Sequence, residues 1–264
     1  MTKQMGPKIG LALGSGGAKG LSHIGVIRVL EDSSIPIDFI AGSSIGACIG
    51  GFYAVTRSVK NIEEVALPRN WRQMLSLFLD PSLHQGLVSG KKIINFIESI
   101  IGRIYFKDLK IPLSVVATDI KTGEAVVINE GEVALAIRAS ASIPLVFKPV
   151  KRNNKLLADG GLSLPVPVKI VKKMGADIVI AVNLDSDYFS NNNINSYGFY
   201  GVVNTSIKIL RYHLSSLNAE EADIIVNPKI GEVGWNKFID GENVILAGEE
   251  AMQQSMSQLK ELIH

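Results

Sequence analysis

A serine flanked by two glycines is the first candidate for chemistry in this sequence. The pentapeptide at 42–46 reads Gly-Ser-Ser-Ile-Gly, which fits the pattern Gly-x-Ser-x-Gly. It lies between an apolar run at 38–41, typical of a strand, and one at 47–55, typical of a helix. In that context a sharp turn exposes the central serine and points a helix N-terminus at the atom it attacks. Glycines are needed because the strained turn leaves no room for Cβ atoms. Ser44 is therefore the candidate nucleophile.

A glycine-rich segment supplies candidate donors for an oxyanion. Residues 14–20 read Gly-Ser-Gly-Gly-Ala-Lys-Gly between a strand-like run at 8–13 and a helix-like run at 21–30. Such a loop exposes backbone N–H groups that can bind an anion. It is not a P-loop, because that motif needs Ser or Thr after the lysine and here Lys19 is followed by Gly20. It is not the dinucleotide fingerprint either, because that pattern would need glycine at position 19. We expect it to serve Ser44 as an oxyanion hole, because its strand should neighbour the strand before the pentapeptide.

The hydroxyl of a serine needs a base within hydrogen-bond reach. The four histidines are His23, His84, His213 and His264. The order of a hydrolase triad, serine then acid then histidine, favours only His213, and nothing around it resembles a catalytic loop. Asp159 is better placed, since it ends a short strand-like run at 155–158 and two glycines follow it. A carboxylate can act as base when desolvation raises its pKa, although Asp-Gly-Gly taken alone is more typical of an ordinary turn.

Three motifs in this order resemble the patatin-like phospholipase family: Gly-Gly-Ala-Lys-Gly at 16–20, Gly-Ser-Ser-Ile-Gly at 42–46, and Asp-Gly-Gly at 159–161. The segments 21–26 and 139–144 agree with it too, and the resemblance covers roughly residues 8–185. The chain is most similar to the short bacterial members that carry no membrane anchor or added regulatory domain. From about residue 187 onward the match is weak.

The resemblance implies a Ser-Asp dyad without histidine, in which Ser44 is the nucleophile and Asp159 the base. It places the oxyanion hole at the backbone N–H groups of Gly16, Gly17 and Ala18. Lys19 stands where many members have arginine, and its charge either favours anionic head groups or supports the loop.

For the remaining positions, the resemblance gives His23 a structural place and Ser140 and Ser142 no chemical role. It implies no cofactor and no metal. The implied reaction is hydrolysis of a lipid or fatty-acyl ester through an acyl-enzyme. Two alternatives stay open: an acyltransferase that uses the same serine with a histidine partner, and a lipid-binding protein with little turnover.

Strand-like and helix-like segments alternate along the first ninety residues, which predicts an α/β fold. We expect a three-layer arrangement, with a central, mostly parallel sheet and helices on both faces. Strands at 113–118 and 124–128 have hairpin spacing, so part of the sheet should be antiparallel. Residues 61–104 read as helices that face the core, or as a partly helical, mobile cap that also meets lipid. We expect one patatin-like domain over 1–264, with core motifs at 8–185 and a less certain part at 187–264.

Composition limits the partners and the compartment. The chain has 264 residues, 47% of them hydrophobic, and a net charge of +2, too small to favour nucleic acid. Its single cysteine, Cys48, rules out an internal disulfide framework and should be a buried thiol. Residues 1–10 lack the apolar core of a signal peptide. The uncharged stretch 39–56 reads as strand, turn and helix rather than a membrane span. We expect a cytoplasmic protein that acts on lipid esters. The aromatic stretch 188–200 could form a peripheral membrane contact or a homodimer interface.

Overall fold

The computed structural model describes residues 6–66, 90–144, 146–189, 198–230 and 241–264. Its strands form one sheet in the order β5-β6-β3-β2-β1-β7-β8, and β4 pairs with β3. The parallel strands are β1 (Ile9–Leu13), β2 (Phe39–Ser43), β3 (Leu113–Asp119), β7 (Ile178–Val182) and β8 (Ile224–Val226). The antiparallel strands are β4 (Ala125–Ile128), β5 (Val150–Arg152) and β6 (Lys155–Asp159). The predicted α/β class, the mostly parallel sheet and the antiparallel hairpin are confirmed.

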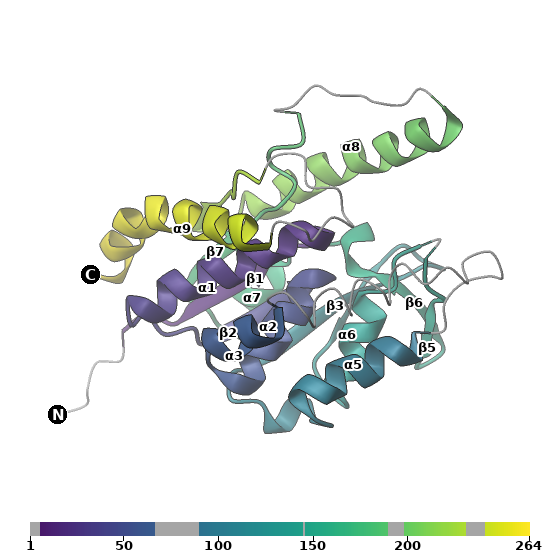
Figure 1. The fold of residues 1–264 in the computed structure, drawn as a ribbon, viewed down its shortest axis with the longest axis horizontal. Coiled ribbons are helices and arrows are strands. Elements are labelled where there is room, and N and C mark those ends of the chain that lie inside the picture. Colours follow the sequence, from purple (N-terminus) through teal and green to yellow (C-terminus); the bar gives the residue numbers. More distant parts are fainter. Residues whose placement is uncertain (1–5, 67–89, 145, 190–197, 231–240) are drawn as a thin grey trace.

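Helices cover both faces of the sheet. One face packs against α1 (Ser22–Asp32), α2 (Ile45–Thr56), α3 (Val59–Ala66), α5 (Lys91–Ile101), α6 (Val133–Ser140) and α9 (Gly241–Ile263). The opposite face packs against α7 (Val168–Met174) and the last residues of α8 (Phe199–Ala219). In Figure 1, α9 lies along α1, and α8 extends away from the sheet. This gives the predicted three-layer arrangement.

Alternation along the central strands explains why both faces are apolar. In β1, Leu11 and Leu13 belong to the larger core, whereas Ala12 belongs to the smaller one under α7. Gly10 also faces α7, and a Cβ at that position would lie 2.1 Å from the side chain of Val171. Successive side chains of a strand point to opposite faces, so a strand buried on both sides reads as a continuous apolar run.

The C-terminal helix belongs to the main core. A Cβ added at Gly25 of α1 would lie 2.0 Å from the carbonyl oxygen of Ile245, and one added at Gly248 of α9 would lie 2.0 Å from that of Ser22. The two backbones therefore approach closely at glycines. Arg28 of α1 forms ion pairs with Glu63 of α3 and Glu249 of α9. The weak family resemblance of this region does not prevent α9 from packing on α1.

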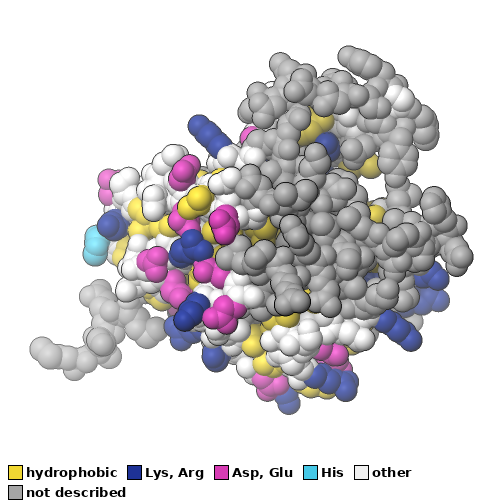
Figure 2. Space-filling model, in the orientation of Figure 1, with side chains coloured by type: hydrophobic (Ala, Val, Ile, Leu, Met, Phe, Trp, Pro, Cys, Tyr) yellow, Lys and Arg dark blue, Asp and Glu magenta, His cyan; other side chains and the backbone are white. Residues whose placement is uncertain are grey.

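Figure 2 shows acidic and basic side chains interspersed on the side of the molecule where α1 and α9 lie. Within the described ranges, no helix combines the length and the hydropathy that crossing a membrane requires. The uncharged stretch 39–56 forms β2 and α2, as predicted, with Ser44 at the turn between them.

Near the C-terminus, helix α8 begins at Phe199, at the end of the aromatic stretch 188–200, and α9 begins at Gly241. Strand β5 was not predicted, because a three-residue strand has too few residues to show alternation. In α5 the isoleucines 93, 97 and 101 are buried, which confirms the core-facing interpretation for that helix. The apolar stripe at 71–79 lies outside the described residues.

Candidate active site

Ser44 lies at a strained turn between β2 and α2. Its φ of 55° and ψ of −118° are unusual for a residue with a side chain. A Cβ at Gly42 would lie 2.4 Å from the carbonyl oxygen of Gly46, and one at Gly46 would lie 2.2 Å from that of Leu13. Both glycines are thus required by space, as the sequence predicted. The backbone N–H of Ser44 donates to the Oγ of Ser140 at 2.8 Å, which fixes the turn from α6.

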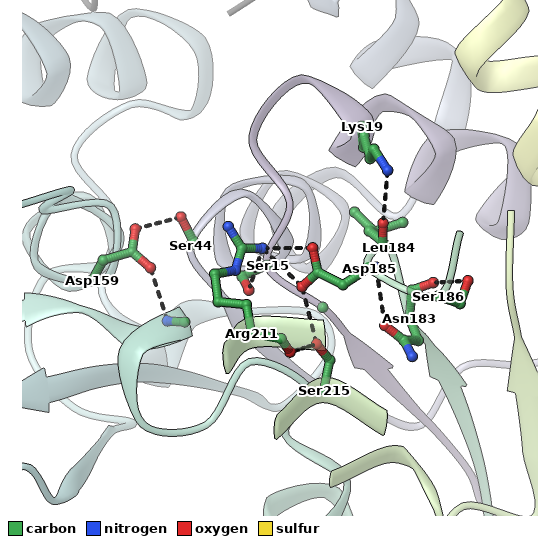
Figure 3. Close-up of polar contacts among 12 residues, drawn as sticks. Ser15, Lys19, Ser44, Asp159, Asn183, Leu184, Asp185, Ser186, Arg211 and Ser215 are labelled. Atoms are coloured by element: carbon green, nitrogen blue, oxygen red, sulfur yellow. Dashed lines mark hydrogen bonds and ion pairs between the residues drawn. The ribbon is translucent and has the colours of Figure 1, made fainter. Parts of the chain in front are cut away.

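Ser44 and Asp159 are in direct hydrogen-bond contact. The Ser44 hydroxyl donates to Oδ2 of Asp159 at 2.6 Å, and the Gly161 N–H donates to Oδ1 at 2.8 Å (Figure 3). Strand register brings these distant residues together, because the neighbours Val116 and Ala117 of β3 pair with Ser43 and Asp159 respectively. Ser44 and Asp159 are each 7% exposed. The carboxylate is therefore held by two donors in a nearly closed site.

The two glycines after Asp159 allow this approach. They begin the short 3₁₀ helix η4 (Gly160–Leu162). A Cβ at Gly160 would lie 2.2 Å from the carbonyl oxygen of Val116, and one at Gly161 would lie 2.7 Å from the Oγ of Ser15. The Asp-Gly-Gly motif is thus a point of close contact between β6, β3 and the glycine-rich loop, in addition to being a turn.

Burial dominates the electrostatics of Asp159 and raises the pKa of its carboxyl above the usual range. Hydrogen bonds from Ser44 and from the Gly161 N–H, and the charge of Arg211, act in the opposite direction without cancelling that effect. A carboxylate with a raised pKa is a stronger base than an exposed one. The environment therefore suits Asp159 to accept the Ser44 proton.

The glycine-rich loop lies beside the turn that carries Ser44. It follows β1, whose Leu13 pairs with Gly42, and it continues into the 3₁₀ helix η1 (Gly17–Leu21). A Cβ added at Gly20 would lie 2.2 Å from the side chain of Ile45, so the loop and the turn are in contact. The first N–H groups of a helix have no acceptor within it. The N–H groups of Gly16, Gly17 and Ala18 thus lie at the N-terminus of η1, where free N–H groups can bind an oxyanion. Their catalytic role remains a prediction.

Lys19 is held by the segment that follows β7. Its Nζ forms an ion pair with Asp187 at 2.6 Å and donates to the carbonyl oxygen of Leu184 at 3.4 Å. These contacts favour a role in supporting the loop. Contact between Lys19 and a substrate head group stays a prediction.

Neither of the two histidines considered as partners contacts the serine. His23 is fully buried, and its Nε2 lies 2.8 Å from the carbonyl oxygen of Gly14. His213 is exposed on α8, where its ring lies edge-on to Tyr212. Among the described residues, the base in contact with Ser44 is Asp159.

Burial lowers the pKa of His23 to about 4. Between about pH 6.5 and pH 4, His23 should therefore be protonated in the unfolded chain but neutral in the folded chain. The free energy of unfolding should fall as pH falls through that window. We expect a loss of roughly 3 kcal/mol across it from this residue. Urea unfolding at pH 7.5 and pH 4.5 measures the loss. His23→Gln, whose side-chain N–H can still reach Gly14, should show a smaller acid-induced loss than wild type; an equal loss in both proteins would contradict the prediction.

Cys48 is buried one turn after Ser44, as predicted, and burial raises the pKa of its thiol to about 12. It is therefore uncharged and unreactive at neutral pH. Within the described ranges, no group of three or more His, Cys, Asp or Glu side chains is placed to hold a metal ion.

Several residues of the site were not found by sequence reasoning. Ser140 accepts the Ser44 N–H and donates to the carbonyl oxygen of Val116 at 2.5 Å. Its position in a run of small residues agreed with the family, and that was its only signal. Ser15, Asp185 and Arg211 form a polar cluster beside Asp159 (Figure 3). Arg211 belongs to an amphipathic helix far along the chain, and nothing in its spacing pointed to the site.

Fold and site together define a class: a mostly parallel α/β protein with a serine at a strand-to-helix turn and a glycine-rich loop beside it. A family model described as patatin-like phospholipase matches residues 11–172, which is more than half of the chain. The chain therefore belongs to the patatin-like phospholipase family.

Individual relatives agree with that assignment. An uncharacterised NTE family protein of Mycobacterium tuberculosis is 41% identical over 180 residues, covering 68% of this chain and 49% of the relative. Lysophospholipase NTE1 of Yarrowia lipolytica is 35% identical over 187 residues, covering 69% of this chain and 13% of the relative. This chain thus spans about half or less of the length of these relatives. The crystal structure of VipD from Legionella pneumophila has the same fold, with a TM-score of 0.57 and 15% identity over 97% of this chain and 67% of VipD.

Proposed function

We propose that this protein is a serine esterase that hydrolyses lipid acyl esters, of the phospholipase or lysophospholipase type, through Ser44, Asp159 and an acyl-enzyme. The observation that carries the proposal is the 2.6 Å hydrogen bond from Ser44 Oγ to Asp159 Oδ2 at a strained strand-to-helix turn. Family membership and a relative named as a lysophospholipase support the lipid substrate class.

In the first half of the proposed reaction, Asp159 accepts the hydroxyl proton of Ser44 while Ser44 Oγ attacks the ester carbonyl carbon. The N–H groups of Gly16, Gly17 and Ala18 stabilise the oxyanion, and each donor contributes about 3 kcal/mol to lowering the barrier. Collapse of the tetrahedral intermediate breaks the bond to the alcohol, which leaves with the proton from Asp159. The acyl group is then covalently bound to Ser44.

In the second half, a water molecule gives a proton to Asp159 and attacks the acyl carbon. Collapse of the second intermediate releases the carboxylic acid, and the proton returns from Asp159 to Ser44. The atoms and protons of the two proposed half-reactions balance without a cofactor. Because lipid esters reside in membranes or micelles, we also propose peripheral contact with such a surface. Exposed apolar side chains on α8 support that contact: Val202, Val203, Ile207, Leu210 and Leu217.

An ester panel of increasing acyl length, assayed with wild type and Ser44→Ala, tests the proposal. Wild type should hydrolyse esters with a preference for one range of chain length, and a fluorophosphonate should label it once. Mass spectrometry should find the adduct on the peptide that contains Ser44. Folded wild type that neither labels nor hydrolyses any ester, yet sediments with lipid vesicles, would instead indicate a lipid-binding protein. Faster transfer to an added alcohol or thiol than to water would indicate an acyltransferase.

A further inference from the structure

The side chain of Arg211 reaches from α8 to the glycine-rich loop. One terminal nitrogen, Nη2, donates to both carboxylate oxygens of Asp185, at 2.9 Å and 3.1 Å, and to Ser15 Oγ at 3.3 Å. Ser215, one turn further along α8, also donates to Asp185, at 3.0 Å. In Figure 3 the guanidinium group lies between Asp185 and the Ser44–Asp159 pair. Helix α8 is thus tied to the catalytic end of the sheet through one arginine.

Ser15 connects this arginine to the candidate base. Its backbone N–H donates to the carbonyl oxygen of Pro165 at 2.9 Å, and the residue is 3% exposed. A Cβ at Gly161 would lie 2.7 Å from Ser15 Oγ and 3.0 Å from Asp159 Oδ1. The Ser15 hydroxyl and the Asp159 carboxylate therefore both lie close to Gly161, whose N–H donates to Asp159 Oδ1. Arg211, Ser15, Gly161 and Asp159 thus form a continuous series of contacts.

The charge of Arg211 also acts on Asp159 and lowers the pKa of that carboxyl, against the larger effect of burial. Arg211 is itself paired with Asp185, and the other charged groups near the site are also engaged. Lys19 pairs with Asp187, and Arg138 donates to Ser142 and to the carbonyl oxygen of Lys148. His23 is neutral above about pH 4. Within the part of the chain that the structure describes, Arg211 is the charged side chain whose field opposes the effect of burial on Asp159.

Arg211 keeps this position at a cost. Its Nε–H is buried and has no acceptor among the described residues. A buried donor without a partner destabilises the fold, and such groups in native structures call for an explanation. The rest of the side chain is only partly enclosed, since 29% of it is exposed. A function at the active site explains why Nε is nevertheless held in a buried position.

We propose that Arg211 is a positioning residue for the Ser44–Asp159 pair: through Ser15 it fixes the glycine-rich loop against Asp159, and it supplies the positive charge that faces the base. This inference rests on the proposed function, because it assigns Arg211 a part in the same reaction. It also makes α8, which lies beyond the segment matched by the family model, a part of the active site.

The pH dependence of ester hydrolysis tests the inference, with Arg211→Gln, Arg211→Lys and the control Lys208→Gln. Lys208 is exposed on the same helix, so its replacement removes the same charge without touching the site. In Arg211→Gln the acid limb of the kcat/KM profile should move to higher pH, and the rate at pH 5.5 relative to pH 8 should fall at least about three-fold. Arg211→Lys should restore most of that ratio, and Lys208→Gln should match wild type.

Two ester substrates separate positioning from head-group binding. A neutral p-nitrophenyl ester and a lysophospholipid with a phosphate group should lose activity to the same degree in Arg211→Gln, mainly in kcat. A rise in KM confined to the phosphate-bearing substrate would overturn the proposal and make Arg211 a head-group ligand. An unchanged acid limb in a folded Arg211→Gln protein would overturn it as well.

A titration that needs no turnover distinguishes failure of this inference from failure of the proposed function. Carbon-13 NMR of aspartate carboxyl groups, with Asp159 assigned by the signal missing in Asp159→Asn, follows the carboxyl directly. Its pKa should rise in Arg211→Gln relative to wild type and Lys208→Gln, even if wild type hydrolyses no ester. An unchanged pKa would reject the role of Arg211, whereas absent ester hydrolysis alone would reject the proposed function.

Discussion

Replacing Ser44 by alanine should reduce ester hydrolysis by roughly ten-thousand-fold or more and abolish labelling by a fluorophosphonate. In the proposed mechanism no acyl-enzyme can form once the Ser44 oxygen is absent, and only the proposed oxyanion donors and substrate binding remain. Initial rates on the preferred ester and intact-protein mass spectrometry measure the two effects. The variant should remain folded, because among the described residues the Ser44 side chain makes one hydrogen bond, to Asp159.

The preceding residue provides a matched control. Ser43 is fully buried, and its Oγ has no hydrogen-bond partner in the part of the chain that the structure describes. Ser43→Ala should therefore keep its activity within a few-fold of wild type and lose no stability. A loss as large in Ser43→Ala as in Ser44→Ala would mean that the turn, and not the Ser44 hydroxyl, had been disrupted.

A further variant at position 44 tests the strain at the turn. Ser44→Gly should be about 1 kcal/mol more stable than Ser44→Ala, because glycine adopts a positive φ without steric cost. Thermal and urea unfolding of the two inactive variants measure the difference. Equal stability would show that the backbone at this position is not strained.

The local motifs could be predicted because each is required by a close backbone approach within a few residues. A Cβ at Gly42 would clash with Gly46, and one at Gly46 would clash with Leu13. In the Asp-Gly-Gly motif, Cβ atoms on the two glycines would clash with Val116 and Ser15. Such requirements leave a signature in sequence even without knowledge of the sheet.

The contribution of α8 could not be predicted, since it depends on tertiary packing. Arg211 is an ordinary charged residue of an amphipathic helix until the fold brings α8 to Ser15 and Asp185. Likewise, Ser140 becomes an acceptor for the Ser44 N–H only through the packing of α6 against β3. Hydrogen bonds between side chains of distant elements leave no periodic pattern and no fixed residue spacing in the sequence. Sequence reasoning therefore missed the roles of these residues.

Replacing Asp159 by asparagine should lower ester hydrolysis on the order of a thousand-fold, because the amide cannot accept the Ser44 proton. Asparagine keeps the shape of the side chain, and its carbonyl oxygen can still accept the Gly161 N–H now bound by Oδ1. Asp119→Asn is a control for loss of a buried carboxylate, since Asp119 accepts the Lys121 N–H in a turn and should remain active within a few-fold. Full activity of Asp159→Asn would redirect the search for a base to His213.

The same substitution should stabilise the fold at neutral pH. Burial raises the pKa of the Asp159 carboxyl above its ordinary value of 3.8, so between that value and the raised pKa the folded chain binds a proton that the unfolded chain releases. Stability from this group therefore decreases as pH rises through that window and stays reduced above it. Asp159→Asn removes the penalty, so it should unfold at a higher urea concentration than wild type at pH 7.5, and the difference should shrink near pH 4. A less stable variant at pH 7.5 would mean that the hydrogen bonds to the carboxylate outweigh its desolvation. A more stable variant would mean that the buried carboxylate of Asp159 destabilises the fold and is present for the reaction.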